Sequence, residues 1–494
     1  MPVFLSIDLG AGSGRVIAAE TDLQSFRLRE IHRFDNPGTD LPGGSFWNII
    51  GLFRDIQEGL RRAVEIYGDS IEAMGVATWG CDHGLLDGQG RLLGMPHQYR
   101  DPRHEGMAEK MKGLIDEFTI YQNTGIQTNF YNTSLHLLAE KTVGSPALAT
   151  AETLLFTPDL LAYWLTGEKA VERTIASTSQ LLDARTGEWA WPVIDALGLP
   201  RRIFGKIVPP GTVLGPIREE VATVIGASGI PVVASASHDT ASAVAGIPME
   251  EQADSLWLSC GTWSIMGLET KSPILSEEAF AAGCSNERGV QDTIRFLKNI
   301  SGLWIIQECK RHWDSQGEAL SYAELAQCAT AAAPFTAFLD PDDPTFAAAG
   351  NMPQKIQDYC IRTGQQPPQG KGEILRVAQD SLALKYRVSY EKFCSLSGTR
   401  FSCLHIGGGG IQNEELMQAT ANALGMDVIA GPVEATSCGN IITQMIATGH
   451  LPDLAAARRL IRNSFEFKTY QPKASAQWND AYADFLKICA AVDV

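Results

Sequence analysis

The chain has 494 residues, of which 45% are hydrophobic and 20% charged, a composition typical of a globular protein. This length exceeds what one hydrophobic core usually supports, so two or three domains are expected. The formal charge of −17 leaves no cationic surplus to neutralise phosphate, which disfavours nucleic acid and anionic membranes as partners. The sequence contains no uninterrupted apolar run of about 18 residues, so no membrane span is expected.

The N-terminal segment and the cysteines favour a cytoplasmic location. The first residues carry no basic region, and Asp8 interrupts the apolar run within one strand's length, unlike a secretory signal. The ten cysteines form no C-x-x-C pair and no Cys/His cluster of zinc spacing. We therefore expect reduced thiols that serve mainly as small packing residues.

The chain opens with a pattern typical of a hairpin. Two apolar runs, Val3–Leu9 and Arg15–Ala19, flank the glycine-rich stretch Gly10–Gly14. Such a loop can bring backbone N–H groups close to an anion. A related pattern recurs where Leu256–Cys260 leads into Gly261-Thr262 and a further apolar run. The recurrence predicts an internally duplicated architecture with a phosphate between the halves, although either loop alone could be an ordinary tight turn.

Helix and strand signals alternate between these two hairpins. Apolar residues recur at helical spacing from Ile49 to Tyr67, and Ile71–Thr78 is typical of a buried strand. The stretch Thr157–Gly167 has the proline near its start and the terminal glycine of a helix. This alternation predicts an α/β fold. Ala245–Pro248, with its glycine and proline, is the best candidate for the boundary between the halves.

A polar motif follows the small apolar run that begins at Pro231. The run leads directly into His238, Asp239 and Thr240, which predicts a strand that ends in a helix start. Asp239 would then stand at the carboxyl edge of a sheet, where α/β proteins bind ligands. A carboxylate there can act as a general base toward a substrate hydroxyl. It can equally serve only as the N-cap of the helix, and this run alone supports both roles about evenly.

The second half repeats the alternation of helices and strands. Residues 374–396 have the pattern of a long helix, and Phe401–Ile406 that of a short strand. This strand is followed by Gly407–Gly410, then by a helix that ends near Gly425 and by the strand Asp427–Ala430. Four consecutive glycines exceed what a strand-to-helix turn requires. We therefore favour a ligand site in which the backbone lies flat against an adenine ring.

Five of these motifs, in this order, resemble the FGGY family of carbohydrate kinases. The motifs are Asp8-x-Gly10, Thr78-Trp79-Gly80-x-Asp82, Ser237-His238-Asp239-Thr240, Ser259-x-Gly261-Thr262 and Gly407–Asn413. The resemblance implies an α/β fold of two actin-like, RNase-H-like domains that close over a cleft holding ATP and sugar. It implies that residues 1–246 carry the sugar site, the first phosphate loop and the catalytic aspartate, and that residues 247–494 bind the nucleotide.

The resemblance also implies the reaction, which is phosphorylation of a ketose by Mg²⁺-ATP. L-rhamnulose, phosphorylated at its 1-hydroxyl, is the expected substrate. Asp239 matches the general base, and Asp8 matches a carboxylate that reaches Mg²⁺ through water. Positions that match nucleotide contacts are Ala11, Gly12, Ser13, Gly14, Arg15, Thr262, Gln307 and Gly409. Positions that match sugar contacts are Gly80, His238, Asp239, Thr240 and Asn299.

Asp82 is a further candidate for sugar binding, because it follows a strand end in a glycine-flanked turn. Its alternative role is that of a turn-forming aspartate. Arg15 likewise could reach phosphate or only pair with a carboxylate. The chain contains no G-x-x-x-x-G-K-[ST] run, so it is not a P-loop enzyme.

Two positions depart from the branch of the family that the chain resembles most. His83 stands where an aromatic residue usually follows the Trp-Gly-x-Asp motif, and Asn48 where an aspartate usually follows Trp47. The alternatives are therefore an L-fuculose kinase, another ketose or alditol kinase of the family, or a non-catalytic actin-like ATP-binding protein. No coiled coil or interface pattern sets the oligomeric state, so a monomer or a homodimer is expected.

Overall fold

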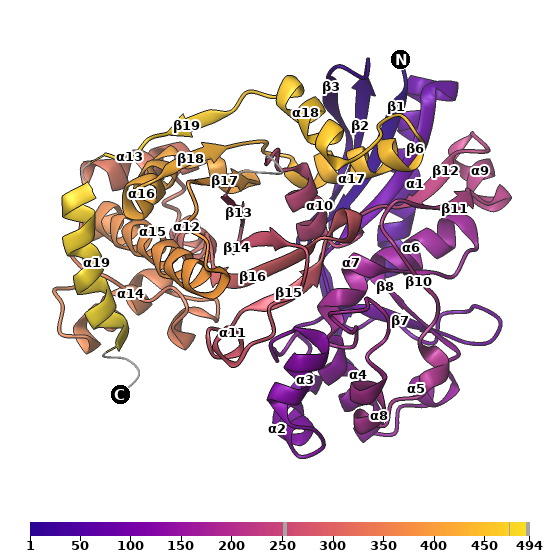
Figure 1. Cartoon of the computed structure of the whole chain (residues 1–494), viewed down its shortest axis with the longest axis horizontal. Helices are drawn as coiled ribbons and strands as arrows, with labels where there is room; N and C mark the ends of the chain where they lie inside the picture. Colours follow the sequence, from indigo (N-terminus) through magenta and orange to yellow (C-terminus); the bar gives the residue numbers. More distant parts are fainter. Residues whose placement is uncertain (250–253, 474, 491–494) are drawn as a thin grey trace. The chain divides into compact units, whose positions relative to one another are not determined.

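The computed structural model describes residues 1–249, 254–473 and 475–490. The chain divides into two compact units (Figure 1). Unit 1 comprises Met1–Pro248, Glu269–Phe296 and Ala435–Phe465, and unit 2 comprises Met249–Leu268, Leu297–Glu434 and Glu466–Val494. The first segment of unit 1 ends at the proposed boundary, Ala245–Pro248. The domain division into residues 1–246 and 247–494 follows the chain and stays a prediction.

The sheet of unit 1 has six strands in the order β11-β12-β6-β1-β2-β3. The strand β1 is antiparallel to β2 and parallel to β6, which is parallel to β12. The carboxyl ends of β1, β6 and β12 therefore lie at one edge of the sheet, and the loops that follow them meet there. The strands are β1 (Val3–Leu9), β2 (Ser13–Thr21), β3 (Phe26–Asp35), β6 (Ile71–Thr78), β11 (Thr212–Pro216) and β12 (Pro231–Ala234).

Helices cover both faces of this sheet, because successive side chains along a strand point to opposite sides. On one face α1 (Ile49–Tyr67) packs on β2 and β3, and α6 (Thr157–Thr166) packs on β6. On the other face α17 (Ala435–Ala447) packs on β1 and β6, and α10 (Asp239–Gly246) packs on α17. Asn48 caps α1 by accepting a hydrogen bond from the Gly51 N–H at 3.0 Å. Since asparagine and aspartate cap helices about equally well, the departure at position 48 leaves this helix start intact.

The second sheet has seven strands in the order β15-β16-β14-β13-β17-β18-β19. The strand β13 is antiparallel to β14 and parallel to β17, which is parallel to β18, and β18 is antiparallel to β19. The five strands β14-β13-β17-β18-β19 thus have the same sequence of antiparallel and parallel neighbours as β2-β1-β6-β12-β11 in the first sheet. The predicted duplication is therefore present in the strand order. The strands are β13 (Ser255–Cys260), β14 (Trp263–Thr270), β15 (Ser285–Arg288), β16 (Ile294–Ser301), β17 (Cys403–Gly407), β18 (Asp427–Ala430) and β19 (Lys468–Tyr470).

Unit 2 has its own apolar core, which α12, α13, α14 and α15 contribute. These helices, with α16, have the bounds α12 (Trp304–Ser315), α13 (Tyr322–Ala331), α14 (Met352–Arg362), α15 (Gly370–Ser397) and α16 (Glu414–Leu424). The long helix predicted for residues 374–396 is confirmed and starts one turn earlier. Figure 1 shows α15 and α16 running beside each other, and the two helices pack together.

Shorter strands and further helices complete the chain between and around these two sheets. The strands among them are β4 (Gly38–Leu41), β5 (Gly44–Trp47), β7 (His83–Leu86), β8 (Thr153–Phe156), β9 (Val171–Glu172) and β10 (Ile207–Val208). The helices are α2 (Met107–Lys112), α3 (Glu117–Thr124), α4 (Thr133–Thr142), α5 (Pro146–Thr150), α7 (Arg173–Ala176), α8 (Trp191–Leu197), α9 (Glu219–Ile225), α11 (Glu277–Ala281), α18 (Leu454–Ser464) and α19 (Ser475–Ala490).

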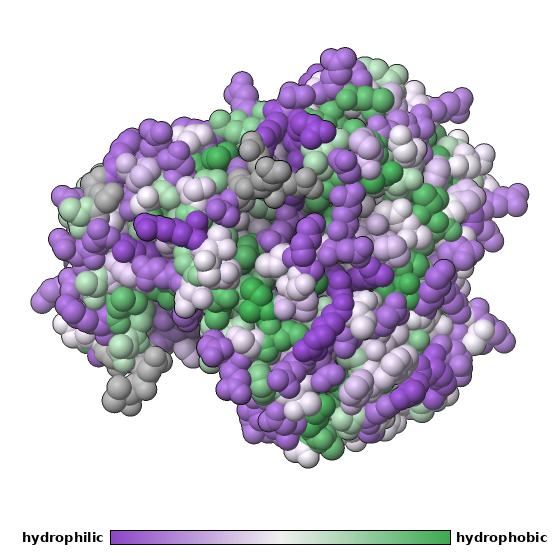
Figure 2. All heavy atoms as spheres, in the orientation of Figure 1, coloured by the Kyte–Doolittle hydropathy of each residue, from purple (hydrophilic) through white to green (hydrophobic). Residues whose placement is uncertain are grey.

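Figure 2 shows a face on which hydrophilic residues predominate and apolar residues form small groups. Within residues 1–249, 254–473 and 475–490, no helix is both long enough and apolar enough to cross a membrane. All ten cysteines are free thiols.

Candidate active site

Three loops of unit 1 meet at the carboxyl edge of its sheet. They follow β1, β6 and β12, and they carry the predicted phosphate, sugar and base residues respectively. The Thr78 N–H donates to the Ser237 carbonyl at 2.8 Å, which joins the second loop to the third. The parallel register of the strands thus brings together residues that are more than 200 positions apart in the sequence, such as Asp8 and Asp239.

The loop after β1 is shaped by an asparagine that sequence analysis did not identify. Asn36 donates its side-chain amide to the Gly10 carbonyl at 2.9 Å and its backbone N–H to the Gly12 carbonyl at 3.1 Å. The carbonyls of the loop are therefore engaged, while Ala11 and Gly12 stay exposed. Gly14 is required by space, because a Cβ there would overlap the ring of Phe34. The loop can present backbone N–H groups to an anion.

Asp8 and Arg15 are directly opposite each other on β1 and β2. Arg15 Nη2 lies 2.7 Å from Asp8 Oδ2, and the Ser437 hydroxyl donates to the same oxygen at 3.5 Å. Burial raises the pKa of Asp8, and the Arg15 charge offsets only part of that increase. The carboxylate pairing considered for Arg15 is therefore one of its contacts in the structure.

Asp239 is the first residue of α10, and His238 holds the N-cap position, so Asp239 is not the N-cap. Asp239 Oδ1 accepts the Thr240 N–H at 2.6 Å and the Thr240 hydroxyl at 3.2 Å, and His238 Nε2 lies 3.3 Å from the same oxygen. Asp239 Oδ2 has no hydrogen-bond partner among the described residues. The side chain is 31% exposed. One carboxylate oxygen is thus held in place and the other is open to a ligand.

Burial raises the pKa of Asp239, the nearby His238 lowers it, and the negative charge of Asp8 raises it further. A carboxylate whose pKa lies above the ordinary aspartate range is a better general base near neutral pH. The repulsion between Asp8 and Asp239 would also be relieved by a cation. Among the described residues no group of three or more His, Cys, Asp or Glu side chains could hold a metal by itself. Mg²⁺ usually binds one or two carboxylates, waters and substrate phosphates, so these residues fit Mg²⁺.

A buried glutamate supports the loop that carries His238 and Asp239. Glu172 Oε2 accepts the Ser237 N–H at 3.1 Å, and its carboxylate also accepts the Thr174 N–H at 2.8 Å. The Thr174 hydroxyl in turn accepts the His238 N–H at 3.2 Å. Sequence analysis did not identify Glu172, because it is more than sixty residues away in the chain and belongs to no motif.

The predicted sugar residue Asp82 is buried, with only 3% of the residue exposed. Its Oδ2 accepts the indole N–H groups of Trp47 at 2.6 Å and Trp79 at 2.8 Å, and the Tyr99 backbone N–H at 3.2 Å. Burial raises the pKa of Asp82 to about 7, although these three donors lower it. Asp82 therefore organises two tryptophans around itself, and Trp79 belongs to this network rather than to an open sugar platform.

The neighbouring residues leave little room in this loop. Gly80 lies against Thr178, because a Cβ at Gly80 would be 3.2 Å from the Thr178 hydroxyl oxygen. Cys81 has a positive φ of 74° and donates its N–H to the same hydroxyl at 3.1 Å. Burial raises the pKa of the Cys81 thiol, and it raises that of Cys260 to about 11, so neither cysteine is a nucleophile.

His83 belongs to a buried polar cluster with Glu140 and Arg103. Its ring is buried, and Nε2 lies 3.9 Å from Glu140 Oε1, which is paired with Arg103 at 3.1 Å. Burial and the Arg103 charge hold the pKa of His83 well below its usual value, so the ring is neutral. The second departure from the family pattern therefore changes a buried polar cluster behind Asp82.

The predicted nucleotide residues of unit 2 gather at the carboxyl ends of β13 and β17. Thr262 follows β13 and donates its hydroxyl to Gln307 Oε1 at 3.0 Å. The glycine loop after β17 packs on Cys260: a Cβ at Gly408 would be 2.8 Å from the Cys260 carbonyl oxygen, and one at Gly410 would overlap its sulfur. Gly409 is exposed, and a Cβ there would meet no atom within 4 Å. Gly408 and Gly410 are thus needed for packing, and Gly409 for an open surface.

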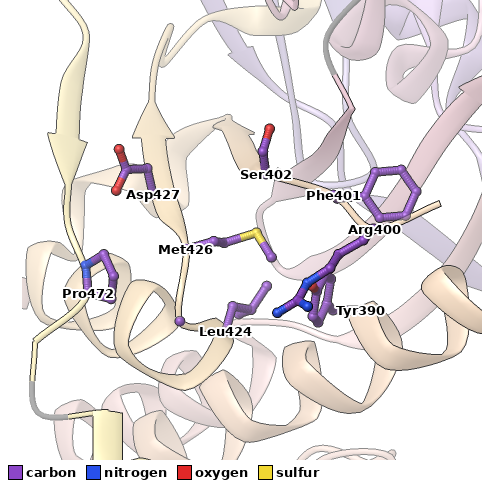
Figure 3. Close-up of a pocket in the computed structure, with 9 residues that line it drawn as sticks. Tyr390, Arg400, Phe401, Ser402, Leu424, Met426, Asp427 and Pro472 are labelled. Carbon is purple, nitrogen blue, oxygen red and sulfur yellow. The ribbon is translucent and has the colours of Figure 1, made fainter.

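Two further features of unit 2 complete the placement of predicted residues. Asn299 lies on β16 and is exposed. A pocket of about 400 Å³ lies at the amino ends of β17 and β18, next to Ser402 and Asp427 (Figure 3). Figure 3 also shows Arg400 alongside Tyr390. Because Gly407–Gly410 follows the opposite end of β17, this pocket is separate from the predicted nucleotide loop.

Models of a known family match both halves of the chain. The N-terminal domain of the FGGY family of carbohydrate kinases matches residues 3–246, and the C-terminal domain of that family matches residues 256–448. The chain belongs to the FGGY family of carbohydrate kinases. It is therefore an enzyme, a sugar kinase with ATP as its substrate, and the non-catalytic alternative is excluded.

Individual relatives are similar over nearly the whole chain. A rhamnulokinase from Bacteroides thetaiotaomicron is 42% identical over 482 residues, which cover 98% of this chain and 98% of the relative. A rhamnulokinase from Enterococcus faecalis is 40% identical over 488 residues, covering 98% of this chain and 97% of the relative.

Solved structures of other kinases share the fold. A xylulose kinase from Lactobacillus acidophilus has a TM-score of 0.83 at 15% identity, with 100% of this chain and 99% of that chain covered. A glycerol kinase from Plasmodium falciparum, solved with ADP, has a TM-score of 0.81 at 16% identity, with 99% and 98% covered. At this identity the likeness concerns the fold, and it confirms the predicted α/β fold of two actin-like domains.

Proposed function

We propose that this kinase transfers the γ-phosphoryl group of ATP to the 1-hydroxyl of L-rhamnulose, with Asp239 as the general base. The observation that carries the proposal is the asymmetry of the Asp239 carboxylate. Thr240 and His238 act on Oδ1, while Oδ2 is available to a substrate hydroxyl. The identity of 42% and 40% to two rhamnulokinases supports the choice of sugar.

In the proposed reaction Asp239 Oδ2 accepts the proton of the sugar hydroxyl as its oxygen attacks the γ-phosphorus of ATP. The bond from the γ-phosphorus to the β–γ bridging oxygen breaks, and ADP leaves with that oxygen. The proton passes from Asp239 to solvent, so the products are ADP and the sugar 1-phosphate. A positioned general base of this kind contributes about 10²–10⁴ in rate.

Stabilisation of the transferred group is assigned to the loop of residues 11–15 and to Thr262. Backbone N–H groups, the Arg15 guanidinium and a hydroxyl can stabilise charge on the phosphoryl oxygens without a P-loop lysine. Gly409 and Gln307 are assigned to the nucleotide. Gly80, Asp82, His238, Thr240 and Asn299 are assigned to the sugar, Asp82 by holding its loop in place.

Asp8 would hold Mg²⁺ through water, consistent with the fit of the two carboxylates described above. When bound, Mg²⁺ neutralises phosphate charge and orients the phosphates of ATP. We further propose that residues 1–246 form the sugar domain and residues 247–494 the nucleotide domain. The enzyme is proposed to act in the cytoplasm as a monomer or homodimer.

The test is a coupled assay of ADP release with L-rhamnulose, L-fuculose, D-xylulose and glycerol as acceptors. L-rhamnulose should have the highest kcat/KM, and ³¹P and ¹³C NMR of the product should place the phosphate on the oxygen of C1. Without sugar, ADP release should be slow. The highest kcat/KM on L-fuculose would support the alternative sugar, and equal values for all four acceptors would refute the proposed specificity.

A further inference from the structure

An ion pair in unit 1 lies behind His238 and is not part of any motif discussed above. Arg295 on β16 has no exposed side-chain surface, and its Nη2 lies 2.9 Å from Glu287 Oε2 on β15. The same Nη2 is hydrogen-bonded to His238 Nδ1 at 3.2 Å. Arg295 Nε donates to the Arg288 carbonyl at 3.0 Å, which fixes the plane of the guanidinium.

Arg295 and Glu287 both contact the same nitrogen of the His238 ring: Arg295 Nη2 and Glu287 Oε2 lie 3.2 Å and 3.3 Å from Nδ1. The opposite ring nitrogen, Nε2, lies 3.3 Å from Asp239 Oδ1. The ion pair therefore holds the ring so that Nε2 faces the oxygen that the substrate does not use.

Glu287 anchors this arrangement. Its carboxylate balances the buried charge of Arg295, and its pKa is lowered to about 2 by Arg295 and His238, so it is ionised. Glu287 Oε2 also lies 3.3 Å from His238 Nδ1, which limits rotation of the ring. A buried arginine without such a partner would be strongly destabilising.

We propose that Arg295, anchored by Glu287, is a positioning residue that fixes the orientation of the His238 ring toward Asp239 Oδ1 and thereby reserves Asp239 Oδ2 for the substrate hydroxyl. This inference rests on the proposed function, because it assumes that Asp239 is the base. It assigns a role to two residues that touch neither the proposed sugar nor the nucleotide.

The test uses the double variant Arg295→Met/Glu287→Gln, which removes both charges together and so leaves no uncompensated buried charge. Its kcat should fall about 10–100-fold, as expected when a reacting group loses its exact orientation, while the KM for ATP stays unchanged. Arg295→Lys keeps a donor and should retain more activity than the double variant.

A second readout does not depend on turnover. In protein labelled with ¹⁵N-histidine, the ring nitrogens of His238, assigned with His238→Gln, should change their chemical shifts in the double variant, because Nδ1 loses both of the groups that hold it. The matched control is Arg376→Met/Asp380→Asn, which neutralises a buried pair of 3.0 Å on α15 and should change neither kcat nor the His238 spectrum.

The outcomes separate this inference from the proposed function. A folded double variant with wild-type kcat and unchanged chemical shifts of the His238 ring would overturn the positioning role. If Asp239→Asn retained wild-type turnover, the base assignment itself would fail, and the inference with it. If Asp239→Asn were inactive while the double variant were normal, only the positioning role would be lost.

Discussion

The same strand order carries opposite chemistry in the two units. At the carboxyl edge of the unit 1 sheet the loops bring charged groups together, namely Asp8, Arg15, Asp239 and the ion pair behind His238. At the corresponding edge of the second sheet, the loops after β13 and β17 carry Thr262 and Gly407–Gly410, which bear no charge. The duplicated frame thus fixes where loops meet, and the residues of each loop decide what the edge can do.

In the proposed function, unit 1 carries proton transfer and the charged phosphate contacts, while unit 2 carries the uncharged contacts of Thr262 and of the glycine loop to the nucleotide. A buried charge must be paired or hydrogen-bonded, so the unit 1 edge needs partners such as Glu172, Thr174 and Arg295. A glycine loop has no charge to compensate. It needs only room beside the ligand and a surface to pack on, and Cys260 provides that surface. Variants at the two edges should therefore fail in different ways.

The largest effect is expected from Asp239→Asn at the charged edge. The nearly isosteric amide keeps an oxygen for Thr240 but cannot accept the proton of the sugar hydroxyl. The kcat should fall by about 10²–10⁴, with ATP binding nearly unchanged. Single-turnover kinetics and calorimetric titration with ATP would measure the two quantities. If the variant turned over at nearly the wild-type rate at saturating sugar, Asp239 would not be the base, and proton transfer could not be assigned to the charged edge.

Asp82→Asn tests the charged edge through stability. The folded-state pKa of Asp82 is raised to about 7. Because the folded protein binds this proton more tightly than the unfolded chain, Asp82 lowers the free energy of unfolding as pH rises from about 4 to about 7. In the wild type this loss of unfolding free energy should amount to about 1–4 kcal/mol, and the asparagine variant should not show it. Denaturant melts at about pH 5 and about pH 8 would measure it; equal pH dependence in both proteins would mean that Asp82 does not bind the proton.

Gly409→Val and Gly410→Ala test the neutral edge as a pair. A side chain at Gly409 has open space in the protein and should obstruct the nucleotide, raising the KM for ATP about tenfold or more, which corresponds to about 1.4 kcal/mol. A methyl group at Gly410 would overlap Cys260 Sγ and should instead lower thermal stability. Steady-state kinetics and melting curves of both variants distinguish the two effects. An unchanged KM for ATP in a folded Gly409→Val variant would refute the adenine assignment.

The smallest effect is expected from Thr262→Val. The substitution removes one hydroxyl, which in the structure donates to Gln307 Oε1 at 3.0 Å. Loss of one hydrogen bond to phosphate should reduce kcat/KM for ATP about 2–10-fold. The kcat/KM for the sugar, measured at saturating ATP, should change less. If the variant altered the sugar parameter more than the ATP parameter, Thr262 would not belong to the nucleotide edge.

Much of the frame could be predicted because local patterns carry it. The strands that end at Leu9, Thr78 and Gly407, and the helix that starts at Asp239, follow from apolar periodicity interrupted by glycine or by polar residues. The partners of the site residues could not be predicted in this way. Asn36, Glu172 and Arg295 reach their targets through hydrogen bonds and ion pairs between distant segments, and such contacts leave no periodicity in the chain.

The roles of single motif residues were also open until their neighbours were known. His83 is adjacent to Asp82 in sequence, yet its ring is close to Glu140, a residue of α4 that is more than fifty positions away. The assignment of Glu269–Phe296 to unit 1 is likewise a matter of packing, since nothing in the composition of that segment marks it. Pairing between remote segments, not local preference, decides such cases.

The intervals between equivalent strands differ greatly in length. Residues 79–230 lie between β6 and β12, whereas only residues 408–426 lie between β17 and β18. The long interval contains Gly80, Asp82, Tyr99, Thr178 and Glu172, while Asp8 and Asp239 belong to the frame itself. Part of the proposed sugar site, Gly80 and Asp82, can therefore change through substitutions in the long interval that leave the base and the phosphate loop in place.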